Sequence, residues 1–130
     1  MLMKGDYVVN TVDRDSKADY RKPFNFEEAK KQGFTRKTLF ETEQMRFSIY
    51  MILPAHENPM HRHPNSDEIL AFTHGKGECV VGDEVIPVEP GSVLFIAKDV
   101  PHAVRNTGDS DILCCTVTQS PLPCEHVMVN

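Results

Sequence analysis

Turn-forming residues recur roughly every ten residues from Gln44 onward, and this spacing limits the folds open to the chain. Between the turns lie short segments, and in the first of them, residues 44–51, apolar and polar side chains alternate as in a strand. Such spacing is typical of an antiparallel sandwich or barrel, and no second long helical pattern interrupts it. The sequence therefore predicts an all-β fold and argues against an α/β fold. The turns are Pro64-Asn65-Ser66-Asp67, Gly75-Lys76-Gly77, Gly82-Asp83, Glu89-Pro90-Gly91, Lys98-Asp99 and Thr107-Gly108-Asp109.

The first part of the chain differs from this pattern. Residues 1–23 carry many charges and one short β-like piece, Tyr7-Val8-Val9, which predicts an arm. A helix of about two turns is expected next, because Asn25 can cap it, Glu28 completes a capping box and Gly33 supplies the stop. We expect one domain in three parts: an N-terminal arm and short helix over residues 1–43, a β-barrel over residues 44–119 and a C-terminal tail over residues 120–130.

Length and charge narrow the class of protein. The chain has 130 residues, which suits one domain with a single core. Its 14 Lys and Arg against 19 Asp and Glu give a net charge of −5, which argues against nucleic acid or an anionic membrane surface as partner. The start lacks an apolar signal region, and no stretch approaches the roughly 20 apolar residues of a membrane span. We therefore expect a cytoplasmic protein.

The cysteines do not form a recognisable metal or redox motif. None of the four has C-x-x-C spacing, so neither a zinc ribbon nor a thioredoxin-type pair is indicated. Unpaired cysteine behaves as a small hydrophobic residue, so buried free thiols are expected. Cys124 lies in a Pro-rich tail and could be more exposed. The other three are Cys79, Cys114 and Cys115.

His61-Arg62-His63 is the first candidate for a metal site. Residues i and i+2 of a strand project from the same face, so both imidazoles can reach one point. Taken alone, the pattern fits two polar residues facing water equally well. The turn at residues 64–67 sharpens it, because a hairpin closed there pairs His63 with Glu68, with Cβ atoms about 5 Å apart.

The surroundings of Glu68 indicate that it points into a core. Leu70 and Phe72 share its face of the next strand, which disfavours the alternative of an exposed His-Glu ion pair. A buried carboxylate beside two imidazoles is costly unless a cation compensates it. His102 is a fourth candidate, on one face of a further strand with Val104 and Asn106. Alone, it would be read as a structural histidine.

Together these residues form two motifs that resemble those of the cupin superfamily. His61-x-His63-x4-Glu68-x6-Gly75 resembles the first conserved motif, and Gly91-x5-Ala97-x-Asp99-x2-His102-x3-Asn106 resembles the second. Fifteen residues separate Gly75 from Gly91, close to the spacing in small microbial cupins. Ala55, Ala97 and Asp99 stand where the family usually has Gly, Pro and Gly. None is a ligand position, and Asp tolerates the left-handed conformation that the turn requires.

The resemblance implies a fold and a metal site. The fold would be a double-stranded β-helix, a small jelly-roll barrel that commonly assembles as a homodimer. His61, His63, Glu68 and His102 would bind one divalent metal ion per chain, and Glu68 could also act as an acid or base. Four such ligands leave two positions open on an octahedral ion, which suits Mn, Fe or Ni better than Zn.

Two classes of function stay open. Related cupins include dioxygenases, decarboxylases, isomerases and lyases, so the resemblance implies a metal-dependent enzyme acting on a small oxygenated, carboxylate or enolisable substrate. An anionic ligand is expected, because one carboxylate leaves a divalent ion with net positive charge. The alternative is a noncatalytic small-molecule-binding or sensing module. A sensor would usually carry a DNA-binding or signalling domain, and we expect none here, which favours the enzyme.

Other polar residues are weaker candidates. Arg46 and Tyr50 lie on the strand face opposite Phe47, so they either orient a substrate inside the barrel or face solvent. His56 is expected at the surface, and His126 is expected to be solvated in the tail. His74 shares the parity of Glu68 but lies about 20 Å along the strand, so it is not expected to be a ligand.

Overall fold

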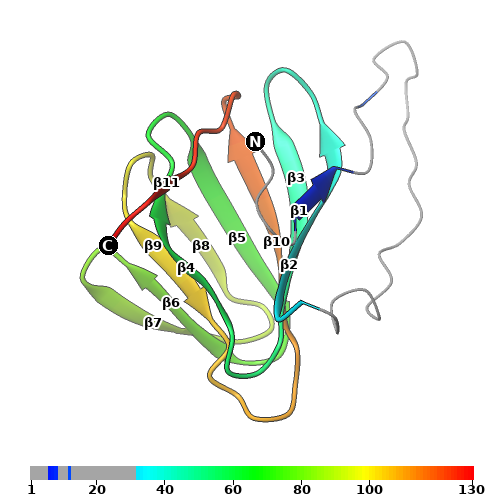
Figure 1. Ribbon diagram of the computed structural model, residues 1–130, viewed down its shortest axis with the longest axis vertical. Coiled ribbons are helices and arrows are strands. Elements are labelled where there is room, and N and C mark those ends of the chain that lie inside the picture. The colour runs from blue at the N-terminus through cyan, green and yellow to red at the C-terminus, as the bar shows by residue number, and fades with distance from the viewer. Residues whose placement is uncertain (1–5, 9–11, 13–31) are drawn as a thin grey trace.

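The computed structural model describes residues 6–8, 12 and 32–130, which fold into two facing β-sheets (Figure 1). The first sheet has the strand order β1-β2-β3-β10-β5-β8, and the second has the order β11-β4-β9-β6-β7. The predicted all-β fold is confirmed. The strands are β1 (Asp6–Val8), β2 (Phe34–Glu41), β3 (Arg46–Ile52), β4 (Glu57–Arg62), β5 (Asp67–His74), β6 (Gly77–Val81), β7 (Glu84–Val88), β8 (Val93–Ile96), β9 (His102–Arg105), β10 (Leu113–Ser120) and β11 (Val127–Met128).

The N-terminal region contributes to the first sheet before residue 44. β2 pairs antiparallel with β3, and β1 pairs parallel with β2. The predicted short helix, with Asn25 and Glu28 near its start, lies outside the described residues. The division of the chain into arm, barrel and tail stays a prediction. No helix in the described part of the chain is long and apolar enough to cross a membrane.

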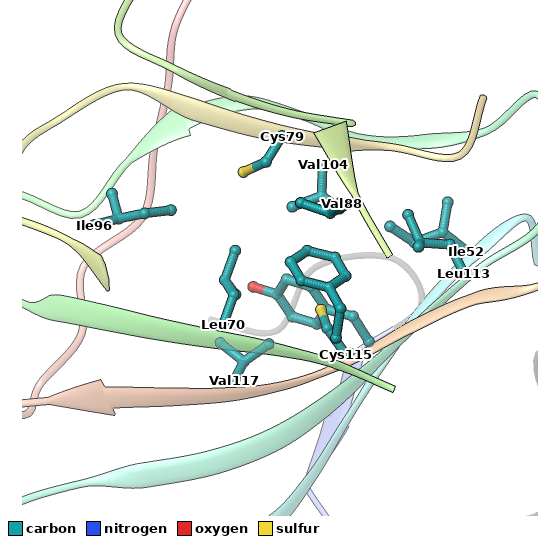
Figure 2. Close-up of a cluster of buried hydrophobic side chains, with 11 residues drawn as sticks. Ile52, Leu70, Cys79, Val88, Ile96, Val104, Leu113, Cys115 and Val117 are labelled. Atoms are coloured by element: carbon teal, nitrogen blue, oxygen red, sulfur yellow. The ribbon is translucent and has the colours of Figure 1, made fainter. Parts of the chain in front are cut away.

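The core fills the space between the two sheets because strands of both present alternate apolar side chains to it. Figure 2 shows Cys79, Val88 and Val104 of the second sheet opposite Leu70, Cys115 and Val117 of the first. These side chains leave almost no surface exposed. The full cluster is Tyr50, Ile52, Leu70, Phe72, Cys79, Val88, Ile96, Val104, Leu113, Cys115 and Val117.

The row of β3 that contains Arg46, Ser48, Tyr50 and Ile52 faces the interior. Tyr50 and Ser48 are 1% and 0% exposed, and Tyr50 packs in the core. Arg46 shares their parity, and its side chain is 15% exposed. Of the two alternatives for this row, the structure therefore favours the barrel interior. On the outer face of the same sheet, Phe95 is 63% exposed.

The prediction that a hairpin pairs His63 with Glu68 is wrong, because the strands on either side of this turn belong to different sheets. β4 pairs with β9 and β11 in the second sheet, whereas β5 pairs with β10 and β8 in the first. Both edges of each strand are thus occupied by other strands. The turn after His63 carries the chain from one sheet to the other, and the two side chains meet across the interior instead of along a ladder.

The two positions where the family usually has glycine adopt left-handed backbone. Ala55 has a φ of 64° and Asp99 a φ of 68°. The expectation that Asp99 makes its turn is confirmed, and the turn is held by its backbone N–H, which donates to the carbonyl of His63 at 2.8 Å. The Asp99 carboxylate also pairs with Arg62 at 2.5 Å. These contacts join the turn before β9 to the end of β4, next to the histidines.

Candidate metal centre

Three buried histidines converge inside the barrel. His61 on β4 and His102 on β9 are direct cross-strand partners, and His63 follows β4 by one residue. Their ring centroids lie 4.2 Å (His61–His102), 4.9 Å (His61–His63) and 5.3 Å (His63–His102) apart. Each is at most 2% exposed, and one nitrogen of each lies within 4.8 Å of the others. This cluster could bind a metal ion.

Hydrogen bonds to backbone carbonyls place a hydrogen on Nδ1 of all three rings. Because a carbonyl oxygen only accepts, each Nδ1 carries the hydrogen and each neutral ring keeps its lone pair on Nε2. Such outer hydrogen bonds orient histidine ligands in metal sites. The bonds are from His61 to Pro59 O at 2.6 Å, from His102 to Val100 O at 2.9 Å and from His63 to Glu125 O at 2.8 Å.

Three of the atoms that face the centre have no hydrogen-bond partner within the part of the chain that the structure describes. Nε2 of His61, Nε2 of His102 and Oε2 of Glu68 are buried with no hydrogen-bond partner among the described residues. Oε2 of Glu68 lies 3.0 Å from Nε2 of His102, an ion-pair distance without hydrogen-bond alignment. Buried polar atoms are normally satisfied, and leaving them unpaired is costly. Three lone-pair donors turned toward one region therefore fit a divalent cation.

Glu68 is fully buried in the same interior, from β5 of the opposite sheet. Its Oε1 lies 3.3 Å from Nε2 of His63 and accepts a hydrogen bond from Gln119 at 2.6 Å. Burial would raise the pKa of Glu68, but the imidazoles of His102 and His63 hold that pKa well below its usual range. The carboxylate is therefore charged in the metal-free protein.

The three rings differ in their readiness to take up a proton. Burial is the main cause that lowers the pKa of His61 to about 3, and the neighbouring His102 ring adds to this effect. Burial also lowers that of His63, but hydrogen bonds with Cys124 and Glu68 outweigh it and raise the pKa to about 10. In the metal-free protein His61 is thus neutral at pH 7, and His63 carries the charge that balances Glu68.

The C-terminal segment contributes to the site, and the expectation that His126 is solvated is wrong. The His126 ring stacks on His61 at 4.5 Å with an interplanar angle of 9°. β11 brings it there by pairing with β4, and Asn65 anchors the side chain of Glu125 at 2.9 Å. Sequence reasoning missed this contact because a two-residue strand has no periodicity to detect.

Gln119 was also missed, although a signal existed. It lies on β10 in the inward row of Cys115 and Val117, and it is 1% exposed. A polar residue continuing an apolar, inward row marks an interior partner.

The other histidine and cysteine expectations agree with the structure. His74 and His56 are exposed and lie outside the cluster. All four cysteines are free, Cys124 is the least buried of them, and its Sγ lies 3.4 Å from Nδ1 of His63.

Comparisons with known proteins identify both the fold and relatives. Residues 48–118, more than half of the chain, match the family model described as Cupin domain. SchB of Streptomyces halstedii is 38% identical over 61 residues, which cover 47% of this chain and 44% of SchB. L-ectoine synthase of Aliivibrio fischeri is 28% identical over 86 residues, covering 65% of this chain and 67% of the synthase. The chain thus spans less than half the length of SchB.

Solved structures share the architecture. A protein with a double-stranded β-helix domain from Klebsiella pneumoniae superposes with a TM-score of 0.74 at 16% identity, over 85% of this chain and 99% of that one. An oxalate oxidase superposes with a TM-score of 0.66 at 20% identity, over 75% of this chain and 55% of that one. At these identities the likeness shows the fold alone, which is the double-stranded β-helix expected from the sequence.

Proposed function

The chain belongs to the cupin family, and from this premise we propose that it is a metal-dependent enzyme acting on a small oxygenated, carboxylate or enolisable substrate. The proposed ligands are the imidazoles of His61, His63 and His102 and the carboxylate of Glu68. One observation carries the proposal. Nε2 of His61, Nε2 of His102 and Oε2 of Glu68 face the interior without a hydrogen-bond partner among the described residues.

The donor set supports an ion with open coordination positions. Three imidazoles and one carboxylate suit Mn, Fe or Ni better than Zn, which favours a closed four-coordinate site. Such an ion supplies Lewis-acid or redox chemistry when bound. With a single carboxylate the site keeps net positive charge, which favours an anionic substrate. The buried side chains around it limit access of water and strengthen these electrostatic interactions.

In this proposal the chain's own groups hold the site ready. The carbonyls of Pro59, Val100 and Glu125 orient the three rings, so little rearrangement is needed when a ligand arrives. Glu68 supplies the negative charge and is the proposed acid or base of the site. Enzymes occur among the similar proteins, including L-ectoine synthase, and this supports catalysis over binding alone.

Elemental analysis tests the proposal directly. The protein is purified without an affinity tag or chelator, beside His61→Ala and His74→Ala. We expect about one Mn, Fe or Ni per chain in the wild type and in His74→Ala, which alters an exposed histidine, and loss of the metal in His61→Ala. Circular dichroism checks that His61→Ala keeps its β-sheet. A wild type that stays metal-free after reconstitution would overturn the proposal.

Turnover separates the enzyme from a binding module of the same fold. Metal-loaded protein is incubated with carboxylates such as oxalate and glycolate, and dioxygen uptake and product formation are measured. Metal-dependent turnover that is lost in Glu68→Gln is the expected result. Tight binding of a carboxylate without turnover of any substrate tested would instead favour the noncatalytic module.

We also propose a homodimer formed through the outer face of β5 and β8. Ile69 and Phe95 are cross-strand partners there, and Val93 lies on the same face. They are 44%, 63% and 64% exposed, which is high for neighbouring large apolar side chains. Sedimentation should give a dimer for the wild type and a monomer for Phe95→Asp. A monomeric wild type would refute this interface.

A further inference from the structure

A row of polar side chains crosses the first sheet and ends at Glu68. Its four members lie on neighbouring strands and are successive cross-strand partners: Glu41 with Arg46, Arg46 with Gln119, and Gln119 with Glu68. Each contacts the next. Glu41 lies 3.6 Å from Arg46, Gln119 accepts from Arg46 at 2.8 and 3.0 Å, and Glu68 accepts from Gln119 at 2.6 Å.

Hydrogen-bond chemistry fixes the direction of this row. A guanidinium group only donates, so the two bonds from Nε and Nη2 of Arg46 must end on the amide oxygen of Gln119. The amide nitrogen then donates to Oε1 of Glu68 at 2.6 Å and also lies 3.4 Å from Nε2 of His63. Flipping the amide would oppose N–H groups to Arg46 and an oxygen to the carboxylate, and would lose all three bonds.

Burial makes the arrangement hard to exchange for another. Gln119 and Glu68 are each 1% exposed, so neither has water as a ready substitute partner. The Arg46 side chain is 15% exposed and Glu41 is 28% exposed, so the row runs from the rim of the sheet to its interior. A charged donor behind the amide strengthens the bond that the amide makes to the carboxylate.

We propose that Gln119 is a positioning residue of the metal site, held in its orientation by Arg46. By donating to Oε1 of Glu68, it would leave Oε2, beside Nε2 of His102, as the oxygen available to a metal ion. This inference rests on the proposed function, since it assigns a role toward the proposed metal. It explains why an amide occupies an otherwise apolar, inward row of β10.

Cobalt(II) binding provides the test. Gln119→Met keeps the length of the side chain and removes its hydrogen bonds. Arg46→Met leaves the amide in place and removes the guanidinium group that bonds it and pairs with Glu41. Affinity is measured by chelator competition, and the visible spectrum is recorded at saturation. We expect Gln119→Met to weaken binding by about 10–100-fold and to shift the absorption bands, with a smaller effect in the same direction for Arg46→Met.

The matched control is Thr118→Val. Thr118 precedes Gln119 on β10, lies on the outward face and pairs with Ile69. The variant should bind cobalt with the affinity and spectrum of the wild type. If Gln119→Met binds as tightly as the wild type with an unchanged spectrum, the positioning role is overturned. A lowered melting temperature with unchanged affinity and spectrum would overturn it as well, because that result describes a purely structural residue.

Failure of the proposed function would look different. If neither the wild type nor Thr118→Val binds cobalt, the metal site itself is refuted. The row is then judged by the side-chain amide protons of Gln119 in the metal-free protein, which should exchange slowly in the wild type and faster in Arg46→Met. Fast exchange in both would refute the row. Should Gln119→Met not fold, Arg46→Met, at a partly exposed position, decides the cobalt test.

Discussion

Oε2 of Glu68 lies 3.0 Å from Nε2 of His102, although the two residues belong to opposite sheets. Nδ1 of His102 donates to the carbonyl of Val100, which leaves Nε2 as the ring nitrogen that faces the carboxylate. Both atoms are buried and have no hydrogen-bond partner among the residues that the structure describes. A cation bound between the two sheets would satisfy both of them.

Metal binding is expected to stabilise the fold. An ion that binds only the folded state adds about 2.7 kcal/mol when its free concentration is 100 times the dissociation constant. Melting curves with added Mn(II) and with EDTA should differ by several degrees in the wild type and hardly at all in His102→Ala. Equal melting temperatures with and without metal in the wild type would contradict this.

The stability of the metal-free protein should be greatest near pH 6.5. An unperturbed histidine has a pKa of 6.5, and burial lowers the pKa of His61 to about 3 and that of His126 to about 4. Below pH 6.5 these two residues therefore take up protons when the protein unfolds, and the free energy of unfolding falls as the pH is lowered. Glu68, with its lowered pKa, adds to the loss at still lower pH. Above pH 6.5 the stabilisation from His63, whose pKa is raised to about 10, is lost progressively.

Melting temperatures from pH 4 to pH 10 in EDTA check this profile. His126→Phe keeps the ring stack on His61 without a titratable group, so its acid limb should be shallower than that of the wild type while the alkaline limb is unchanged. A melting temperature that rises steadily from pH 6.5 to pH 10 would contradict the raised pKa of His63 and its ion pair with Glu68.

One thiol of the four should react readily in the metal-free protein. Burial, aided by the charge of Glu68, raises the pKa of Cys79 to about 12, and burial raises that of Cys114 to about 11 and that of Cys115 well above its usual value. Burial also acts on Cys124, but the hydrogen bond with His63 lowers its pKa. Since the thiolate is the nucleophile, iodoacetamide at pH 7.5 should label Cys124 first. Mass spectrometry should find this modification absent in Cys124→Ser. Labelling of another cysteine at the same rate would contradict the lowered pKa of Cys124.

Ala55→Gly should stabilise the protein. The left-handed backbone at φ 64° costs an alanine about 1–2 kcal/mol, of which the greater flexibility of glycine in the unfolded chain offsets about 0.5–1 kcal/mol. The melting temperature should rise by roughly 2–5 °C. Ala97→Gly is the matched control, because Ala97 is also exposed but has no positive φ, and it should melt slightly lower than the wild type. A loss of stability in both variants would show that the strain at Ala55 is relieved by its surroundings.

Local patterns predicted the strands between residues 44 and 119 and the convergence of His61, His63 and Glu68. They did not predict β2, β11 or the strand pairing behind that convergence. The turn after His63 looks the same in sequence whether it closes a hairpin or crosses between sheets. The difference arises from β8, β9, β10 and β11, which occupy the edges of β4 and β5. The alternation of β10 indicates that Gln119 points inward, but its contact with Glu68 depends on that long-range arrangement, as does the place of His126.

The division of the ligands between the two sheets also bears on how the molecule assembles. His61 and His102 lie side by side in the second sheet and His63 extends from it, whereas Glu68 comes from the first sheet. A folding intermediate with only one sheet formed would hold imidazoles without the carboxylate, and so would bind metal weakly. Tight metal binding during refolding should therefore begin only when the two sheets pack together. The bound ion would link the two sheets and lower the rate at which they separate during unfolding.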